Sequence, residues 1–229
     1  LLEIFQKNIL HKLHNMDKNY EFNVAEILIN IGSVKFSFNK PFTLTSGLKS
    51  PVYVDCRKII SYINERTIIL NYAIDYFKYY NIKFDILAGG ETAGIPYASF
   101  LSQILMKPMI YIRKKPKGFG KDQQIEGNYR ENDRAILIED LATDGGSKVI
   151  FLDAMSKSKL KVSDIFVIFY YDIFDISKTL LGSKNIKIHS LCTWKNIIEV
   201  IKYKKLYSLE EIKNLEIFLK DPNKWRSNL

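Results

Sequence analysis

Two adjacent carboxylates, followed by a short turn rich in hydroxyls and glycines, form the segment of this sequence best suited to chemistry. Glu139 and Asp140 come after the apolar residues 135–138, and the turn that follows contains Thr143, Asp144, Gly145, Gly146 and Ser147. Glycines permit a tight turn, and the backbone N–H groups at the start of the next helix bind anions with help from neighbouring hydroxyls. The paired acids can accept hydrogen bonds from a vicinal diol or hold a hydrated divalent cation. A phosphate site beside diol acceptors indicates that this segment binds a ribose phosphate.

The same turn could instead be an ordinary helix start, with an N-cap and two acids on the surface. It is not a P-loop, because the Gly-x-x-x-x-Gly-Lys spacing is absent. The acid pair comes directly after a continuous apolar strand in an alternating chain, and this position favours a functional site.

A second segment is strongly basic and contains five positive charges, on Arg113, Lys114, Lys115, Lys117 and Lys121. A run of like charges is usually a solvated surface. The whole chain has 34 basic and 25 acidic residues, a net charge of +9, and only six of the basic residues are Arg. Because Arg is the residue that contacts phosphates and guanine edges bidentately, this Lys-rich excess predicts no nucleic-acid partner.

The composition is that of an ordinary globular protein of 229 residues, with 47% hydrophobic and 26% charged residues. The longest apolar run, residues 165–171, is far shorter than the roughly 20 residues of a membrane-spanning helix, so we expect no membrane partner. The first residues show no basic flank before an apolar stretch, so we expect no secretory signal. Cys56 and Cys192 lie far apart without metal-ligand spacing or a nearby His, which predicts a cytoplasmic protein without a catalytic thiol.

Strands and helices must position these segments. After expected helices at 3–16 and 22–31, short β-rich pieces at 34–38, 42–45 and 52–56 predict antiparallel strands of a small lobe. From residue 64 onward, helices and apolar strands alternate: helix 64–80, strand 84–90, helix 94–106, strand 109–113, strand 135–140, helix 145–159, strand 164–171, helix 175–181, strand 186–191 and helix 194–204. This pattern predicts an α/β fold with a parallel sheet flanked by helices.

We expect three parts along the chain: N-terminal helices with the small lobe over 1–60, the main α/β core over 61–204, and a C-terminal helix and tail over 205–229. Ligands of a parallel sheet bind at the carboxyl ends of its strands. This rule selects the loops that follow those strands for closer inspection, at 89–94, 113–130, 140–147 and 172–175.

Four segments together resemble one known family. ILIEDLATDGGS (136–147) looks like the phosphoribosyl-diphosphate motif of the type I phosphoribosyltransferases. PFTLTSGLKSPVYVDCRK (41–58), AGGETAGIPYA (88–98) and YIRKKPKGFGKDQQIEG (111–127) resemble the orotate phosphoribosyltransferases among them. The resemblance implies a type I phosphoribosyltransferase-like fold with the small lobe as a hood over the base. It also implies transfer of phosphoribosyl from phosphoribosyl diphosphate to orotate, giving orotidine 5′-phosphate in pyrimidine (UMP) biosynthesis, with Mg²⁺ as cofactor.

The resemblance implies roles for residues on the donor side. Glu139 and Asp140 would contact the ribose hydroxyls, and the turn would hold the 5′-phosphate through Thr143, Asp144, Gly145, Gly146 and Ser147. Leu141 and Ala142 complete this expected substrate-binding segment. The leaving diphosphate would meet the backbone of 89–94 and the basic residues Arg113, Lys114 and Lys117. Lys117 and Asp140 are the expected catalytic residues, and no residue is assigned as a direct metal ligand.

On the base side, the resemblance assigns Ser46, Gly47, Lys49 and Tyr53 to the lobe that closes over orotate. The chain differs here from the enteric branch of the family: Thr45 replaces a Lys, Thr92-Ala93 replace Tyr-Lys, Phe119 replaces a His, and 170–176 contains no Arg. The carboxylate of the base would then need Lys49, Arg57 or backbone N–H groups. Tyr171 and Asp172 lie at the end of a strand and could also reach the base.

Members of the family form two-fold dimers in which the basic loop of one subunit completes the site of the other. The resemblance therefore implies a homodimer in which loop 113–130 reaches the neighbouring site. Two alternatives remain at this point: a type I phosphoribosyltransferase that uses another base, and a non-enzymatic regulator that keeps the fold.

Overall fold

The computed structural model describes residues 19–44, 47–116, 124–143, 145–175 and 181–227. The expected helix at 3–16 and most of the one at 175–181 lie outside these ranges. The described elements are α2 (Tyr20–Asn30), β1 (Val34–Phe36), β2 (Phe42–Thr43), β3 (Lys49–Ser50), β4 (Val52–Val54), η1 (Cys56–Ser61), α3 (Ile63–Tyr79), β5 (Ile86–Gly90), α4 (Gly94–Leu105), β6 (Met109–Ile112), β7 (Ile125–Glu126), β8 (Arg134–Ala142), α5 (Gly146–Lys157), β9 (Lys161–Tyr170), η3 (Gly182–Lys184), β10 (Lys187–Thr193), α6 (Trp194–Tyr203), α7 (Leu209–Lys220) and α8 (Pro222–Arg226).

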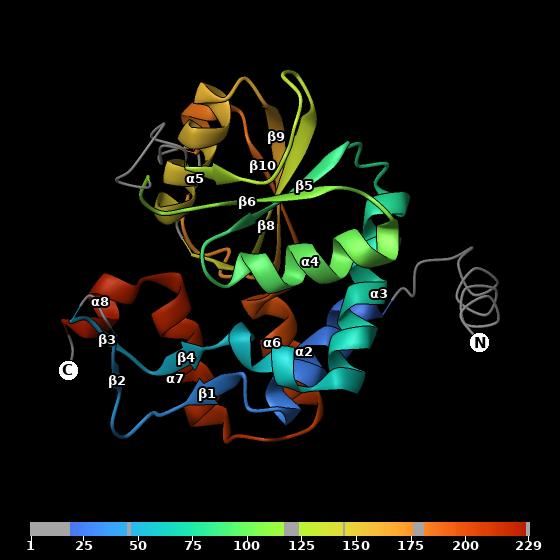
Figure 1. The fold of residues 1–229 in the computed structure, drawn as a ribbon. Helices are drawn as coiled ribbons and strands as arrows, with labels where there is room; N and C mark the ends of the chain where they lie inside the picture. The colour runs from blue at the N-terminus through green and yellow to red at the C-terminus, as the bar shows by residue number, and fades with distance from the viewer. Residues whose placement is uncertain (1–18, 45–46, 117–123, 144, 176–180, 228–229) are drawn as a thin grey trace.

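The main sheet has six strands in the order β10-β9-β8-β5-β6-β7. Its first five strands are parallel to one another, whereas β7 runs antiparallel to β6 at the edge (Figure 1). The predicted α/β fold with a parallel sheet flanked by helices is confirmed. Strand β7 was missed because it is only two residues long and lies inside the segment expected to be a loop.

Alternation along the central strand explains how helices come to cover both faces of the sheet. In β8, Ile136 and Ile138 join one buried cluster, which includes Tyr97 and Leu101 of α4. Leu137, between them, points to the opposite face and joins the second cluster with residues of α5. Successive side chains of a strand point to opposite faces, so a strand with continuous apolar residues needs a helical layer on each side.

Strand β8 continues through Ala142, past the expected end at Asp140, because Leu141 and Ala142 pair with Phe169 and Tyr170 of β9. The acid pair therefore lies within the part of β8 that pairs with β9, near the carboxyl end of the strand. A paired backbone fixes the directions of its side chains more tightly than a loop does.

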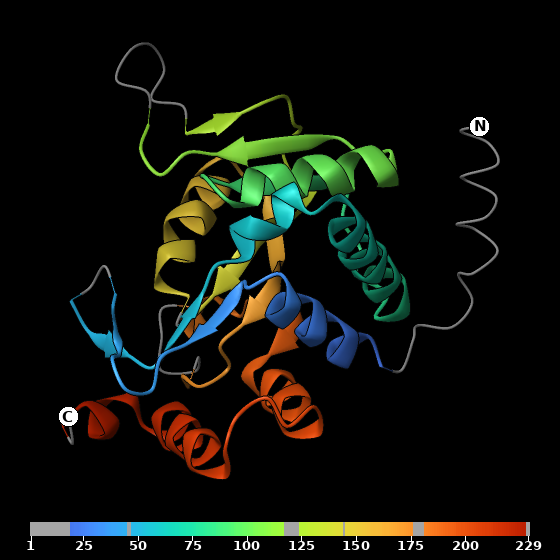
Figure 2. The ribbon, with the colours of Figure 1, turned by 90° about the horizontal axis from the view of Figure 1, so that it is seen from below.

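The small lobe contains two separate antiparallel ladders, β1 with β4 and β2 with β3. The C-terminal helix α8 packs against it, and Figure 2 shows α8 beside the β2–β3 hairpin. Arg226 of α8 donates to the backbone carbonyl of Lys49, Nε to O, at 2.8 Å. The rings of Phe36 and Tyr207 also lie 4.8 Å apart. The small lobe is therefore built from both ends of the chain.

None of the helices in the described ranges is both long and apolar enough to cross a lipid bilayer.

Candidate active site

A cavity of about 500 Å³ lies where the carboxyl ends of the central strands meet the small lobe. Its walls come from segments far apart in the sequence: Tyr53, Asp55 and Arg57 near η1; Glu91, Thr92 and Ala93 between β5 and α4; Lys114 after β6; Glu139, Asp140, Leu141 and Thr143 along β8 and the next turn; Lys148 of α5; and Tyr171 after β9. The position agrees with the rule that open α/β sheets bind ligands at the carboxyl ends of their strands.

A buried ion pair forms the floor of this cavity. The Nζ of Lys148 lies 2.7 Å from Oε2 of Glu139, and the two side chains are only 9% and 5% exposed. Burial raises the pKa of Glu139 to about 7, against the opposing effect of Lys148. The other carboxylate oxygen, Oε1, is buried and has no hydrogen-bond partner among the described residues. Such an atom is costly unless a ligand donates to it.

Asp140 is the second acid of the cavity. Burial raises its pKa, while Lys148, two backbone N–H groups and Arg57 oppose that rise. Adjacent residues of a strand point to opposite faces, but both acids line the same cavity because it opens at the end of the sheet. The predicted acid pair is therefore brought together at one site.

Two glycines make room for this arrangement. A Cβ on Gly90 would overlap Oε1 of Glu139, and a Cβ on Gly94 would overlap the carbonyl oxygen of Ile138. Without side chains at these positions, α4 and the loop before it can approach β8 closely. The motif AGGETAG thus allows backbone to lie directly beside the Glu139 carboxylate.

The turn after β8 leads into α5 as the sequence predicts. Gly145 is the N-cap of α5 with φ +78, and a Cβ there would also overlap the side chain of Leu181. A positive φ favours glycine, which explains the first glycine of the motif. Thr143 lines the cavity, whereas Asp144 and the side chain of Ser147 lie outside the described residues.

The basic segment contributes one of its described residues to the cavity. The backbone N–H of Lys114 donates to Oε2 of Glu91 at 2.6 Å, which joins the start of the segment to the loop after β5. Arg113 is not in the cavity wall; its Nη1 lies 3.8 Å from Oε1 of Glu126 at the sheet edge. Lys117 lies outside the described residues, so its role stays a prediction.

Among the residues predicted to meet the base, Tyr53 lines the cavity, whereas Gly47 and Lys49 do not. The Nζ of Lys49 donates to Oγ1 of Thr43 at 2.8 Å within the β2–β3 hairpin. Ser46 lies outside the described residues. Of the cations considered for the base, Arg57 therefore lies in the cavity wall and Lys49 does not.

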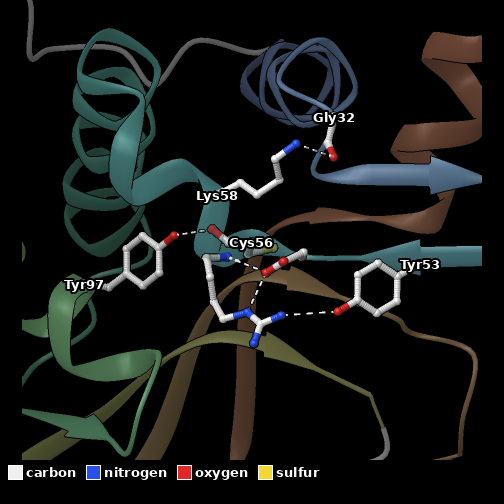
Figure 3. Close-up of polar contacts among 7 residues, drawn as sticks. Gly32, Tyr53, Cys56, Lys58 and Tyr97 are labelled. Atoms are coloured by element: carbon white, nitrogen blue, oxygen red, sulfur yellow. Dashed lines mark hydrogen bonds and ion pairs between the residues drawn. The ribbon is translucent and has the colours of Figure 1, made fainter. Parts of the chain in front are cut away.

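Two hydrogen bonds fix the orientation of the Arg57 side chain. Its Nε donates to Oδ1 of Asp55 at 2.6 Å and its Nη2 donates to the hydroxyl of Tyr53 at 3.2 Å. Figure 3 shows the Tyr53 hydroxyl at the end of this bond, with the Tyr97 hydroxyl contacting Cys56 of the same segment. The hydrogen bond from Arg57 to Asp55 raises the pKa of the guanidinium further, so it is always charged.

Tyr171 lies at the boundary of two cavities. It lines the main cavity and a second one of about 410 Å³, which Asp172 also lines. Its ring packs edge-to-face against Trp194, with centroids 5.5 Å apart. Asp172 does not line the main cavity.

Sequence reasoning missed Lys148, Asp55 and Glu91. Lys148 carried a usable signal, because a positive charge in the first turn of a helix opposes the helix dipole and needs a compensating partner. Asp55 and Glu91 had no such signal in the sequence. Each is part of the site because of a contact made in the folded chain, Asp55 with the side chain of Arg57 and Glu91 with the backbone N–H of Lys114.

Neither of the two cysteine thiols is suited to act as a nucleophile. Cys56 and Cys192 are buried and unpaired, and burial raises the pKa of both thiols well above the ordinary value. No group of three or more His, Cys, Asp or Glu side chains within the described ranges could hold a metal ion. The charged side chains that line the cavity are suited to binding a charged ligand.

Comparisons with known proteins point to one family. No family model matches the chain. It is 43% identical over 204 residues to an orotate phosphoribosyltransferase of Ruegeria sp. (strain TM1040), covering 88% of this chain and 90% of that protein. A crystal structure of orotate phosphoribosyltransferase from Aeropyrum pernix superposes with a TM-score of 0.68 at 26% identity, over 79% of this chain and 98% of that one. A structure of Leishmania donovani UMP synthase gives a TM-score of 0.71 at 27% identity, covering 89% of this chain and 42% of that longer one.

Proposed function

The chain belongs to the orotate phosphoribosyltransferase family and transfers phosphoribosyl from phosphoribosyl diphosphate to orotate, and from this premise we propose that the cavity at the end of β8 is its active site. The observation that carries the assignment is the Glu139 carboxylate, whose buried Oε1 has no hydrogen-bond partner among the described residues. A ribose hydroxyl of the donor would supply the missing hydrogen bond, with Asp140 accepting from its neighbour.

The reaction builds positive charge on the ribose and negative charge on the leaving diphosphate. Catalysis therefore depends on positioning and on electrostatic neutralisation. In our proposal Thr143 and the N-terminus of α5 hold the 5′-phosphate, while Lys114 and Lys117 meet the diphosphate. Lys148 keeps Glu139 in place as an acceptor. The buried thiols take no part.

Mg²⁺ fits this site as an ion that arrives with the donor. Magnesium is usually held by one or two carboxylates together with substrate phosphates and water. The cavity offers carboxylates of this kind, because Glu139 and Asp140 both line it. We propose that Asp140 would contact the ion, which supplies charge neutralisation on the diphosphate.

Turnover with different bases tests the proposal directly. We expect orotate to be consumed in the presence of phosphoribosyl diphosphate and Mg²⁺, and uracil, adenine and hypoxanthine to give less than about 1% of that rate, since a site built for a charged group rejects analogues lacking it. Absorbance changes of each base report the reaction. Comparable turnover with a purine base would show that the base assignment is wrong.

We propose that the protein is a homodimer in which loop 113–130 of one subunit completes the site of the other. Support comes from the family and from Lys114, which lines the cavity near the start of this basic segment. Two-fold symmetry would make both sites equivalent. We also propose a cytoplasmic location, supported by two free cysteines at buried positions.

Mixing two inactive variants tests the shared site. Lys117→Ala and Asp140→Asn proteins are unfolded together and refolded, so that half of the dimers carry one copy of each. Each mixed dimer then holds one doubly altered site and one intact site, and about a quarter of wild-type activity should return. Mixed dimers that form, as verified with two affinity tags, but stay inactive would show that each site is built within one chain.

A further inference from the structure

The carboxylate of orotate distinguishes it from uracil, and the cavity must meet that charge with donors. Three cationic side chains line the cavity within the described residues: Arg57, Lys114 and Lys148. Lys148 is bound to Glu139 on the donor side. Lys114 belongs to the basic segment and is joined to the loop after β5. Arg57 is the cation that the small lobe contributes.

The guanidinium of Arg57 is oriented and still has donors to offer. It carries five N–H groups. Within the described part of the chain, its side-chain hydrogen bonds use Nε, to Asp55, and one N–H of Nη2, to Tyr53. The edge formed by Nη1 and the second N–H of Nη2 matches the two oxygens of a carboxylate. Two fixed contacts thus present a bidentate edge.

The backbone on both sides of Arg57 is also held. The hydroxyl of Tyr97 donates to the carbonyl oxygen of Cys56 at 2.6 Å. The Nζ of Lys58 donates to the carbonyl oxygen of Ile31 at 2.9 Å. It also donates to the carbonyl oxygen of Gly32 at 3.2 Å (Figure 3). A charged side chain on a held segment loses less conformational entropy when it binds a ligand.

Tyr97 connects this segment to the donor side of the cavity. It lies in α4, which begins at Gly94 directly after the loop of Glu91–Ala93 in the cavity wall. A single hydrogen bond therefore links the helix that follows the expected diphosphate loop to the segment that carries Arg57. Arg57 and Asp140 also affect each other's pKa, so the two sides lie within electrostatic range.

We propose that Arg57 recognises the carboxylate of the pyrimidine, with Asp55 and Tyr53 as positioning residues that aim its guanidinium. This proposal rests on the proposed function of the cavity. It assigns to η1 the carboxylate recognition for which residues 170–176 supply no Arg.

Binding of two nucleotides that differ only in the carboxylate provides the test. Dissociation constants of orotidine 5′-phosphate and UMP are measured by calorimetry for the wild type and Arg57→Ala. We expect the variant to bind orotidine 5′-phosphate about 10- to 100-fold more weakly, the range for hydrogen bonds to charged groups. Its affinity for UMP should stay within about threefold, because UMP makes no carboxylate contact.

Two further variants sharpen the result. Arg57→Lys keeps the positive charge but cannot donate two parallel hydrogen bonds to a carboxylate. It should therefore show a preference for orotidine 5′-phosphate between those of the wild type and Arg57→Ala. Arg134→Ala is the matched control, because Arg134 also donates through Nε and Nη2 to an aspartate, Asp85, but lies outside the cavity wall. This control should keep the wild-type preference.

The outcomes separate this proposal from the assignment of function. A wild type that does not consume orotate contradicts the proposed function. A wild type that consumes orotate, with Arg57→Ala retaining the full preference for orotidine 5′-phosphate, overturns only the role of Arg57. Loss of the preference in Lys49→Ala and not in Arg57→Ala would assign the carboxylate to Lys49 and would also overturn the proposal.

Discussion

Replacing Lys148 by methionine is expected to lower the free energy of unfolding by about 3 to 5 kcal/mol, the usual cost of removing one partner from a buried ion pair. Glu139 would remain as a buried carboxylate without its cation, and its Oε1 has no hydrogen-bond partner among the described residues. Chemical denaturation should be measured near pH 8, above the pKa of about 7 that burial gives Glu139 in the wild type, so that the wild-type pair is ionised. Loss of Lys148 raises the pKa of Glu139 further, because Lys148 opposes the effect of burial.

The matched control is Lys184→Met, which removes the same cation from an exposed pair. Lys184 Nζ lies 2.7 Å from Asp153 Oδ1, with side chains 35% and 48% exposed. Exposed pairs contribute about 0 to 1 kcal/mol. The double variant Glu139→Gln with Lys148→Met should recover part of the loss, because both charges are then removed. A Lys148→Met protein no less stable than Lys184→Met would contradict the burial argument.

The second large effect concerns the basic segment. Lys117→Ala is expected to slow the chemical step by about 100- to 1,000-fold, the usual cost of removing one donor aimed at developing charge. Lys117 lies between Pro116 and Gly118 in the segment that resembles the family's diphosphate loop. Stability should change by less than about 0.5 kcal/mol, because the expected role of Lys117 is toward the ligand and not toward the fold. Single-turnover rapid quench measures the chemical step separately from product release.

Lys115→Ala is the control for this second experiment. Lys115 is exposed, belongs to the same basic segment and is absent from the cavity wall. Its removal lowers the general positive charge equally, so a loss confined to Lys117→Ala would indicate a specific contact. Equal losses in the two variants would mean that the segment acts only through its total charge, and the catalytic role of Lys117 would be wrong.

The sheet, and the meeting of Glu139, Asp140 and Thr143 at one strand end, could be predicted from the sequence because their information is local. Continuous apolar strands alternating with helices specify a covered parallel sheet. Residues 139–146 are continuous in sequence, so the two acids and the turn necessarily lie near the same end of β8. The positive φ of Gly145 likewise follows from a turn that only a few residues define.

Tertiary structure alone decided which distant residues share the cavity. Lys49 and Arg57 are equally basic and close in sequence, yet η1 brings Arg57 to the cavity wall while the β2–β3 hairpin keeps Lys49 away. The packing of α8 on β3 joins Arg226 to Lys49, 177 residues apart. Periodicity shows only which face of an element is apolar. The pairing of faces from distant elements depends on the packing of the whole chain, and this is why Arg57 and the Glu139–Lys148 pair required the structure.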